Sequence, residues 1–519
     1  MSEAERKDHG PDFSLGVSAG EFPASGLLRG HVGDDTVLVA RSGEEYFAVG
    51  ASCTHYGASL AEGVLVDDTV RCPWHHACFS LRTGEAIRAP AFDSLTCWSV
   101  EQRDGKVFVT AEKTTSPETT SKRVVSRSAQ PSRIVVVGGG AAGFAAAWML
   151  RREGYVGSLL MVSADSDLPV DRPNLSKDYL AGTAPEEWVP LKPQSWYGEH
   201  GIDLRLNTEV VNLHVGSREV ELGSGERLPY DRLLLATGAE PVTLALPGAN
   251  RGNVFTLRSL ADCRRIIAAA QPGRRVVVIG ASFIGLEVAA ALRARNLDVH
   301  VVAPEKRPLE RVFGAELGDF IRRLHEEHGV VFHLENTVTA IDSNQLHLRD
   351  DSILDADFVV VGVGVRPRTS LAEKAGLLVD RGVRVSDYLQ TTVPEVFAAG
   401  DLARWPDRRS GRDVRVEHWV VAERLGQTAA RNMLGARERY EDVPFFWSQH
   451  YDVPINYVGH AESWDELTVE GDVAGRDCVV RYKRNGRLLA AASIYRDVQN
   501  LEAELALEDE GRALQAAIA

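Results

Sequence analysis

The sequence predicts a multidomain α/β protein with a small, mainly β domain at its N-terminus. The chain has 519 residues, which is too long for a single hydrophobic core. Residues up to about 111 contain short strand-like runs separated by Gly, Asp and Ser. Two later stretches, 133–143 and 275–287, each pass from a β-branched strand through a glycine-rich turn into a helix, as in parallel α/β sheets.

Composition narrows the function classes. Hydrophobic residues make up 44% of the chain and charged residues 25%, as in ordinary globular proteins. The net charge of −15 argues against a nucleic-acid partner and against docking on anionic lipid. No apolar run reaches the roughly 18 residues that a membrane span needs, and the N-terminus is polar. We therefore expect a cytoplasmic protein without a membrane partner.

The first glycine-rich stretch has the pattern of a dinucleotide site. Arg133–Val137 predicts a strand, Phe144–Arg151 predicts a helix, and G-x-G-x-x-G lies between them. Gly138 allows the tight turn, Gly140 lets the backbone approach a pyrophosphate, and Gly143 lets the helix lie close to the strand. The N–H groups at the start of the helix would face the phosphates.

Further residues extend this interpretation. Asp165 follows the next predicted strand, Ser158–Val162, at the distance expected for an acid that binds the adenosine ribose. The second stretch repeats the pattern with Gly280, Ser282 and Gly285, so that serine replaces the middle glycine. Serine adds only a small side chain, and a second dinucleotide site is therefore expected.

The acid of the second site indicates which nicotinamide cofactor binds. The strand Val299–Val302 is followed by Glu305, which would bind the ribose diol and would favour NADH. Lys306 and Arg307 come next, and these cations leave NADPH as the alternative cofactor.

Two cysteine–histidine pairs lie in the N-terminal β region. Cys53 and His55 form C-x-H, and Cys72 and His75 form C-x-x-H sixteen residues later. Two sulfurs and two nitrogens would satisfy zinc. One cysteine and one histidine in each loop suit a [2Fe–2S] cluster better, with two thiolates on one iron and two imidazoles on the other.

Residues 53–79 resemble a Rieske [2Fe–2S] domain, and the resemblance implies Cys53, His55, Cys72 and His75 as the cluster ligands. Ala58 stands where high-potential members have a disulfide cysteine, so that bridge is absent. His76 stands where glycine is usual, and the sequence gives no function for it.

The stretch 168–177, LPVDRPNLSK, resembles the flavin-dependent ferredoxin reductases. The resemblance implies that Arg172 lies on the diphosphate side of FAD and Lys177 beside the reactive edge of the flavin, where Glu287 pairs with it. These two residues, Lys177 and Glu287, are the catalytic pair that we expect. Other stretches match the same family, and the cofactor-binding positions that they imply are Ala236, Gly364, Asp401, Glu417, His418, Trp419 and Trp447.

The resemblance also implies a domain order. The Ser/Thr-rich stretch 112–131 reads as a linker. The NAD(P) domain is expected to be inserted between two segments of the FAD domain, and the order is residues 10–111 (Rieske), 112–131 (linker), 132–258 (FAD, first segment), 259–375 (NAD(P)), 376–440 (FAD, second segment) and 441–519 (α+β reductase C-terminal domain).

Two functions follow from the likeness to Rieske–flavoprotein fusions related to apoptosis-inducing factor and to oxygenase ferredoxin reductases. In the first, electrons pass from NADH through FAD to the [2Fe–2S] cluster and on to a ferredoxin, cytochrome or oxygenase. In the second, bound NADH changes the conformation of a redox-sensing signalling protein. The C-x4-C dithiol of the disulfide reductases is missing after the first fingerprint, which argues against thiol–disulfide exchange.

Overall fold

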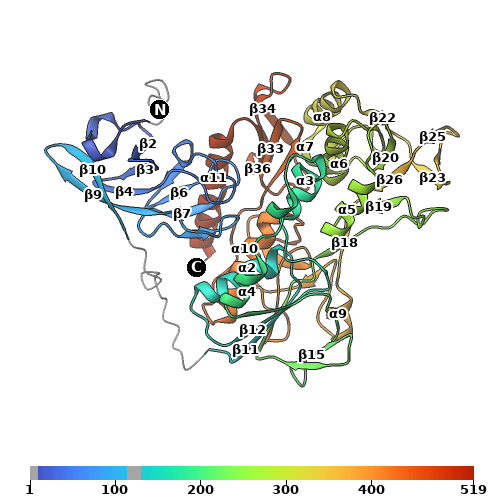
Figure 1. Ribbon diagram of the computed structural model, residues 1–519, viewed down its shortest axis with the longest axis horizontal. Helices are drawn as coiled ribbons and strands as arrows, with labels where there is room; N and C mark the ends of the chain where they lie inside the picture. The colour runs from blue at the N-terminus through green and yellow to red at the C-terminus, as the bar shows by residue number, and fades with distance from the viewer. Residues whose placement is uncertain (1–9, 114–129, 519) are drawn as a thin grey trace. The chain divides into compact units, whose positions relative to one another are not determined.

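The computed structural model describes residues 10–113 and 130–518, and the chain divides into two compact units (Figure 1). Unit 1 contains Met1–Val125 and Arg496–Ala513, and unit 2 contains Ser126–Tyr495 and Leu514–Ala519. Most of the predicted linker, residues 114–129, lies outside the described residues. Within the described ranges, no helix is long and apolar enough to cross a membrane.

Unit 1 is built from two antiparallel sheets. One has the order β1-β10-β9-β4-β3-β2 and the other β5-β6-β7-β8. The strand-like runs of the sequence, Thr36–Ala40, Tyr46–Val49, Val64–Val66 and Val107–Thr110, correspond to β3, β4, β5 and β10. The described elements of this unit are η1 Phe13–Leu15, β1 Val17–Ser18, η2 Ala19–Glu21, β2 Leu27–Val32, β3 Asp35–Ser42, β4 Glu45–Gly50, η3 Leu60–Glu62, β5 Val64–Val66, β6 Thr69–Arg71, β7 Cys78–Ser80, β8 Ala86–Arg88, β9 Cys97–Arg103, β10 Lys106–Glu112 and the part of α11 Asp497–Ile518 that ends at Ala513.

Unit 2 contains two parallel five-stranded sheets. The first has the order β13-β12-β11-β17-β29 and the second β19-β26-β20-β21-β22. All strands of the second sheet lie in the chain between β17 and β29 of the first, so the second nucleotide-binding fold is inserted in the first. Their strands are β11 Arg133–Val137, β12 Ser158–Val162, β13 Ile202–Arg205, β17 Arg232–Leu235, β19 Val254–Thr256, β20 Arg275–Ile279, β21 Asp298–Val302, β22 Val331–His333, β26 Phe358–Val361 and β29 Val396–Ala398.

The C-terminal sheet of unit 2 is antiparallel, with the order β32-β33-β36-β35-β34. Its strands are β32 Phe445–His450, β33 Val453–Gly459, β34 Glu466–Asp472, β35 Asp477–Arg484 and β36 Arg487–Ile494. Smaller sheets are formed by β14 Val210–His214, β15 Glu219–Leu222 and β16 Arg227–Pro229; by β23 Val338–Ile341, β24 Gln345–Leu348 and β25 Ile353–Asp355; by β18 Ala239–Pro241 and β27 Val365–Pro367; and by β28 Val383–Arg384, β30 Ala403–Asp407 and β31 Arg412–Val414.

The helices of unit 2 include the two that follow the glycine-rich turns, α2 and α6. In the described residues, its helices are α2 Ala141–Arg152, η5 Arg172–Ser176, α3 Asp178–Ala181, η6 Glu186–Trp188, α4 Gln194–Glu199, α5 Leu260–Ala269, α6 Phe283–Ala294, α7 Glu310–Phe313, α8 Ala315–Glu327, α9 Ser370–Lys374 and α10 Trp419–Met433. The helix predicted at Phe144–Arg151 corresponds to α2.

One close helix contact shapes the pocket described below. Gly426 of α10 lies so near α2 that a Cβ atom there would meet the Ala142 carbonyl oxygen at 2.2 Å. Because glycine permits this approach, the N-terminal turns of α2 and α10 reach the same cavity, which Ala142 and Trp419 both line.

Candidate functional site

A cavity of about 480 Å³ in unit 2 brings together most of the predicted cofactor-binding residues. Twelve of them line it: Gly140, Arg172, Lys177, Ala236, Ser282, Glu287, Gly364, Asp401, Glu417, His418, Trp419 and Trp447. The other six lie outside its lining: Gly138, Gly143, Asp165, Gly280, Gly285 and Glu305. Residues from the first nucleotide fold, the inserted fold and the C-terminal sheet thus meet at one place.

The glycines outside the lining shape the turns that bound the cavity. Gly138 has φ +118°, and a Cβ atom on it would lie 2.2 Å from the Ala236 carbonyl oxygen. A Cβ atom on Gly143 would lie 1.9 Å from the Gly138 carbonyl oxygen. Gly280, with φ +106°, and Gly285 repeat these two contacts in the second fold. A side chain is therefore excluded at all four positions.

Ser282 explains why serine replaces the middle glycine of the second fingerprint. Its hydroxyl accepts a hydrogen bond from the Gly285 N–H at 3.2 Å and donates one to the Gly362 carbonyl oxygen at 2.6 Å. Ser282 is the N-cap of α6 and ties the helix start to the next strand end.

Arginines make one end of the cavity cationic. Arg258, which the sequence analysis missed, lies 2.6 Å from Asp401 through Nη2 and Oδ2, while its buried Nε has no hydrogen-bond partner among the described residues. Burial, with help from the nearby Arg258 charge, lowers the pKa of Arg172 to about 10. Arg172 also lies 3.2 Å from Asp165. Arg172 lies next to Gly140, the N-cap of α2, and Arg258 lines the same cavity with an unpartnered Nε, so both fit an anionic diphosphate.

Lys177 and Glu287 form a buried ion pair at the cavity wall. Lys177 Nζ lies 2.8 Å from Glu287 Oε2, and the Glu287 side chain is 3% exposed. Burial opposes ionisation of Glu287, but the Lys177 charge and hydrogen bonds from Lys177, Ser176 and Ser448 outweigh it, so the pKa of Glu287 lies below its usual value. Glu287 is therefore a carboxylate at neutral pH.

Aromatic groups cover the adjoining wall. The His418 ring stacks on Phe446 with centroids 3.9 Å apart, and burial lowers the pKa of His418 to about 3. Lys177 Nζ lies over the Trp447 ring at 5.8 Å. A neutral imidazole and an indole present flat surfaces to the cavity, which suit a planar ring system.

The Cys/His quartet of unit 1 forms two pairs. The thiols of Cys53 and Cys72 are hydrogen bonded to each other, and the Nδ1 atoms of His55 and His75 lie 3.2 Å apart. In the described part of the chain, no three His, Cys, Asp or Glu side chains converge as the ligands of a single metal ion would. One sulfur pair and one nitrogen pair match the donor set of two irons with different ligands.

The loops that carry the two Cys/His pairs, residues 53–58 and 72–77, are called here the first and second ligand loops. They have the same backbone hydrogen bonds. The Cys53 N–H donates to the Ala58 carbonyl oxygen, and the Cys72 N–H donates to the Ala77 carbonyl oxygen, both at 2.8 Å. His76 occupies the position in the second loop that Gly57 occupies in the first. Both have positive φ, +59° and +79°. This accounts for the glycine that is usual at His76.

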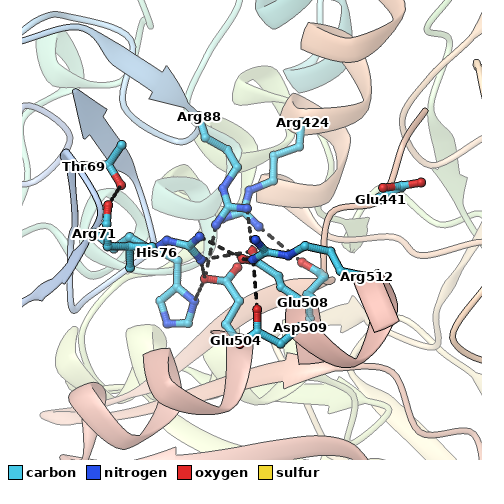
Figure 2. Close-up of polar contacts among 12 residues, drawn as sticks. Thr69, Arg71, His76, Arg88, Arg424, Glu441, Glu504, Glu508, Asp509 and Arg512 are labelled. Atoms are coloured by element: carbon cyan, nitrogen blue, oxygen red, sulfur yellow. Dashed lines mark hydrogen bonds and ion pairs between the residues drawn. The ribbon is translucent and has the colours of Figure 1, made fainter. Parts of the chain in front are cut away.

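His76 gains a partner that the sequence did not reveal. Its Nδ1 lies 3.1 Å from Glu504 on α11, and both side chains are fully buried. Figure 2 shows that Arg71 and Arg88 point toward the same helix, each bonded to Glu504 at 3.3 Å and to Glu508 at 2.8 Å. Residues 496–513, which the sequence grouped with the C-terminal domain, thus cluster with unit 1 and contact the second ligand loop.

Comparison with known proteins matches this architecture. The Rieske [2Fe-2S] domain family matches residues 17–99, the pyridine nucleotide-disulphide oxidoreductase family 132–426, and the reductase C-terminal family 445–519. The chain belongs to the pyridine nucleotide-disulphide oxidoreductase family. It is an FAD-dependent NAD(P)H oxidoreductase that also carries a Rieske domain. The six cysteines are buried and not joined in disulfides, and none lines the cavity.

Three similar proteins illustrate the family. Human apoptosis-inducing factor 3 is 35% identical over 476 residues, which is 89% of this chain and 78% of that protein. The ferredoxin–NAD(+) reductase component of the anthranilate 1,2-dioxygenase system of Burkholderia cepacia is 38% identical over 372 residues, 71% of this chain and 91% of that protein. The covalent putidaredoxin reductase–putidaredoxin complex contains a chain with a TM-score of 0.71 and 33% identity, covering 73% of this chain and 93% of that one.

Proposed function

We propose that this protein passes electrons from NADH through FAD to a Rieske [2Fe–2S] cluster, and from the cluster to a one-electron carrier protein of the ferredoxin type. The observation that supports this most is the presence, in one chain, of a nucleotide cavity and a separate thiol–imidazole quartet. FAD accepts two electrons together from a nicotinamide and releases them singly, whereas a Rieske cluster accepts one electron at a time. The number of electrons that each group accepts at one time therefore gives the order NADH, FAD, [2Fe–2S] cluster and carrier protein.

We propose specific roles for the residues around the two sites. Arg172 and Arg258 would bind the FAD diphosphate with the start of α2, and Asp401 would bind the ribityl chain. Lys177 and Glu287 would lie beside the reactive edge of the flavin. Cys53, His55, Cys72 and His75 would ligate the cluster.

The choice of acceptor rests on the relatives. Proteins similar to unit 2 are named as ferredoxin–NAD(+) reductase components of oxygenase systems, and one is solved in complex with putidaredoxin. A small iron–sulfur carrier protein of the ferredoxin type is the corresponding partner for this chain. Cytochromes and an oxygenase itself are the other partners to test.

A second function is favoured by one comparison. The relative with the greatest coverage among those described above is an apoptosis-inducing factor, and it spans both the Rieske and flavoprotein regions. In that case NADH would form a long-lived complex that signals the redox state. Rapid turnover with a one-electron acceptor supports the reductase, and a persistent reduced complex without turnover supports the sensor.

Cys72→Ser separates the two electron-transfer steps. Serine is a harder and poorer ligand to iron, so the variant should lose the [2Fe–2S] absorbance while keeping FAD. NADH should bleach the flavin within about twofold of the wild-type rate, because binding residues of unit 2 are unchanged, but reduction of the carrier protein should fall at least about tenfold. Stopped-flow absorbance measures both steps.

Cys97→Ser is the matched control, since Cys97 is a buried cysteine of the same unit outside the quartet. It should keep the cluster and the activity. Wild-type carrier reduction by Cys72→Ser would show that the Rieske domain lies off the path. Zinc without acid-labile sulfide in the purified protein would contradict the cluster itself.

A further inference from the structure

A chain of buried polar side chains runs from Glu287 toward the surface of unit 2, behind the cavity. It crosses the core between α6, α8 and β32, where apolar side chains surround it. The successive distances are Glu287 Oε1–Ser448 Oγ 2.7 Å, Ser448 Oγ–His450 Nε2 3.2 Å, His450 Nδ1–His325 Nε2 3.1 Å and His325 Nδ1–Tyr451 Oη 3.3 Å.

Burial differs sharply between the two ends of this chain. Ser448, His450 and His325 are fully buried, and Glu287 is 4% exposed. Tyr451 is half-buried, and its ring stacks on the exposed His328 at 3.6 Å between centroids. Tyr451 is therefore the member of the chain with partial exposure to solvent, whereas Glu287 lies at the cavity wall.

The protonation states fix the direction of every hydrogen bond. Glu287 is ionised and can only accept, so the Ser448 hydroxyl donates to it. Ser448 has no second proton, so His450 must donate from Nε2–H. Burial lowers the pKa of His450 to about 4 and that of His325 well below its usual value, so both rings are neutral at pH 7.

The remaining bonds follow in the same way. A neutral His450 that carries its proton on Nε2 must accept at Nδ1, so His325 donates from Nε2–H. His325 then accepts at Nδ1 from the Tyr451 hydroxyl, whose pKa burial raises, so that it keeps its proton. Each member thus donates to the next, from Tyr451 inward to Glu287.

Such an arrangement can transfer a proton by one hop per bond. A proton from solvent replaces the one that leaves Tyr451, each imidazole passes on its Nε2 proton as Nδ1 gains one, and Ser448 delivers its own to Glu287 Oε1. Afterwards every bond is reversed, so the same chain can return one proton to the surface.

Electron transfer gives this movement a cause. Once NADH has delivered its electrons and NAD+ has left, the cavity holds one more negative charge. An added negative charge raises the proton affinity of a buried carboxylate. A cavity closed by cofactor and nicotinamide excludes water from the front, so a route from the back is useful.

We propose that Tyr451, His325, His450 and Ser448 form a proton relay that brings one solvent proton to Glu287 when electrons enter the cavity and returns it when they leave. The overall reaction stays balanced: NADH and two oxidised one-electron acceptors give NAD+, two reduced acceptors and one proton. The relayed proton is taken up and released again within each cycle. This inference rests on the proposed oxidation of NADH at this cavity.

Proton uptake during anaerobic reduction tests the relay without any acceptor. Holoenzyme in weak buffer with a pH-indicator dye is mixed with NADH, and the dye and flavin absorbances are followed together. Wild type should take up about one proton per NADH in step with bleaching. His450→Gln keeps a donor and an acceptor but cannot pass a proton, so its uptake should lag at least about tenfold behind bleaching.

Companion variants make the result decisive. Glu287→Gln should show no uptake, because the acceptor is gone, and Tyr451→Phe should slow uptake as His450→Gln does. If His450→Gln does not fold, Ser448→Ala breaks the chain at the next bond. Bleaching without uptake in wild type, or uptake by His450→Gln at the wild-type rate, would overturn the relay. Absence of bleaching by NADH would instead contradict the proposed function.

Discussion

At the residue scale, Glu305 and the pairing of the cations next to it bear on the choice between the two nicotinamide cofactors. Arg307 is already paired, with Asp319 at 2.7 Å and Glu310 at 3.2 Å, which leaves it less available to a 2′-phosphate. Glu305 itself follows β21 and is half-buried. A carboxylate there would accept bonds from a ribose diol and repel a phosphate.

We therefore expect a higher kcat/KM with NADH than with NADPH. Glu305→Gln should reduce the ratio of kcat/KM for NADH to kcat/KM for NADPH by about tenfold, which corresponds to about 1.4 kcal/mol of transition-state binding. Lys306→Ala, which removes the exposed neighbouring cation, serves as the control and should leave the ratio unchanged. A wild-type preference for NADPH that Lys306→Ala abolishes would contradict this assignment. Steady-state kinetics with both cofactors measures it.

Some site residues were predictable and others were not, for a physical reason. Gly138 and Gly280 are visible in the sequence because a tight turn demands positive φ from a residue within a local motif. Arg258 and His76 owe their roles to Asp401 and Glu504, which lie far along the chain. Local patterns carry no information about such partners, so only the fold reveals them.

At the element scale, α11 contributes acids to the buried ion-pair cluster of unit 1. Glu504 is fully buried and contacts Arg71, Arg88 and His76. Removing one member of a buried ion pair leaves its partners charged and unpaired, at a cost of about 3–5 kcal/mol. The stability of the second ligand loop should therefore depend on this helix.

Glu504→Ala should lower the denaturant midpoint for loss of [2Fe–2S] absorbance by an amount equivalent to about 3–5 kcal/mol. The midpoint for release of FAD should change little, because the residues of the cavity are in unit 2. Glu502→Ala is the control, since Glu502 lies on the same helix and is exposed. Equal midpoints for the two variants would mean that the ion pairs do not hold the loop.

Strands with a continuous apolar run could be predicted from the sequence, whereas the packing of one element against another could not. The parallel strands read directly from runs such as Val276–Ile279 and Phe358–Val361, since strands buried on both faces are continuously apolar. The association of α11 with unit 1 was not foreseen. Neighbours in the sequence usually share a domain, and the acids of this helix look like ordinary surface charges until their arginine partners are placed.

At the scale of the whole molecule, the sequence was sufficient for the fold class and the insertion of one nucleotide fold in the other. The two glycine-rich motifs indicate two nucleotide folds, and the resemblance to ferredoxin reductases implies that the second is inserted in the first. The buried histidines of unit 2 were not predicted as a group. His325 and His450 come from α8 and β32, and only the tertiary structure buries them within hydrogen-bond distance of each other, while His418 at the start of α10 is half-buried and lines the cavity.

These histidines predict how the stability of unit 2 depends on pH. Burial lowers the pKa of His418 to about 3 and of His450 to about 4, and that of His325 well below 6.5. Below pH 6.5 the unfolded chain therefore binds more protons than the folded chain. The stability that these groups contribute is present above pH 6.5 and is lost as pH falls toward 4, by up to ~1.4 kcal/mol per pH unit for each histidine.

Urea unfolding followed by flavin fluorescence between pH 7.5 and 5 measures this slope. His450→Gln should reduce it by the contribution of one proton, because glutamine does not titrate. His200→Gln replaces an exposed histidine and should leave the slope as in wild type. Glu287 does not confuse the interpretation, since its lowered pKa places its own titration below 4.5. A slope that His450→Gln leaves unchanged would mean that water reaches this ring in the folded protein, and the uniform hydrogen-bond direction deduced for the relay would then lose its basis.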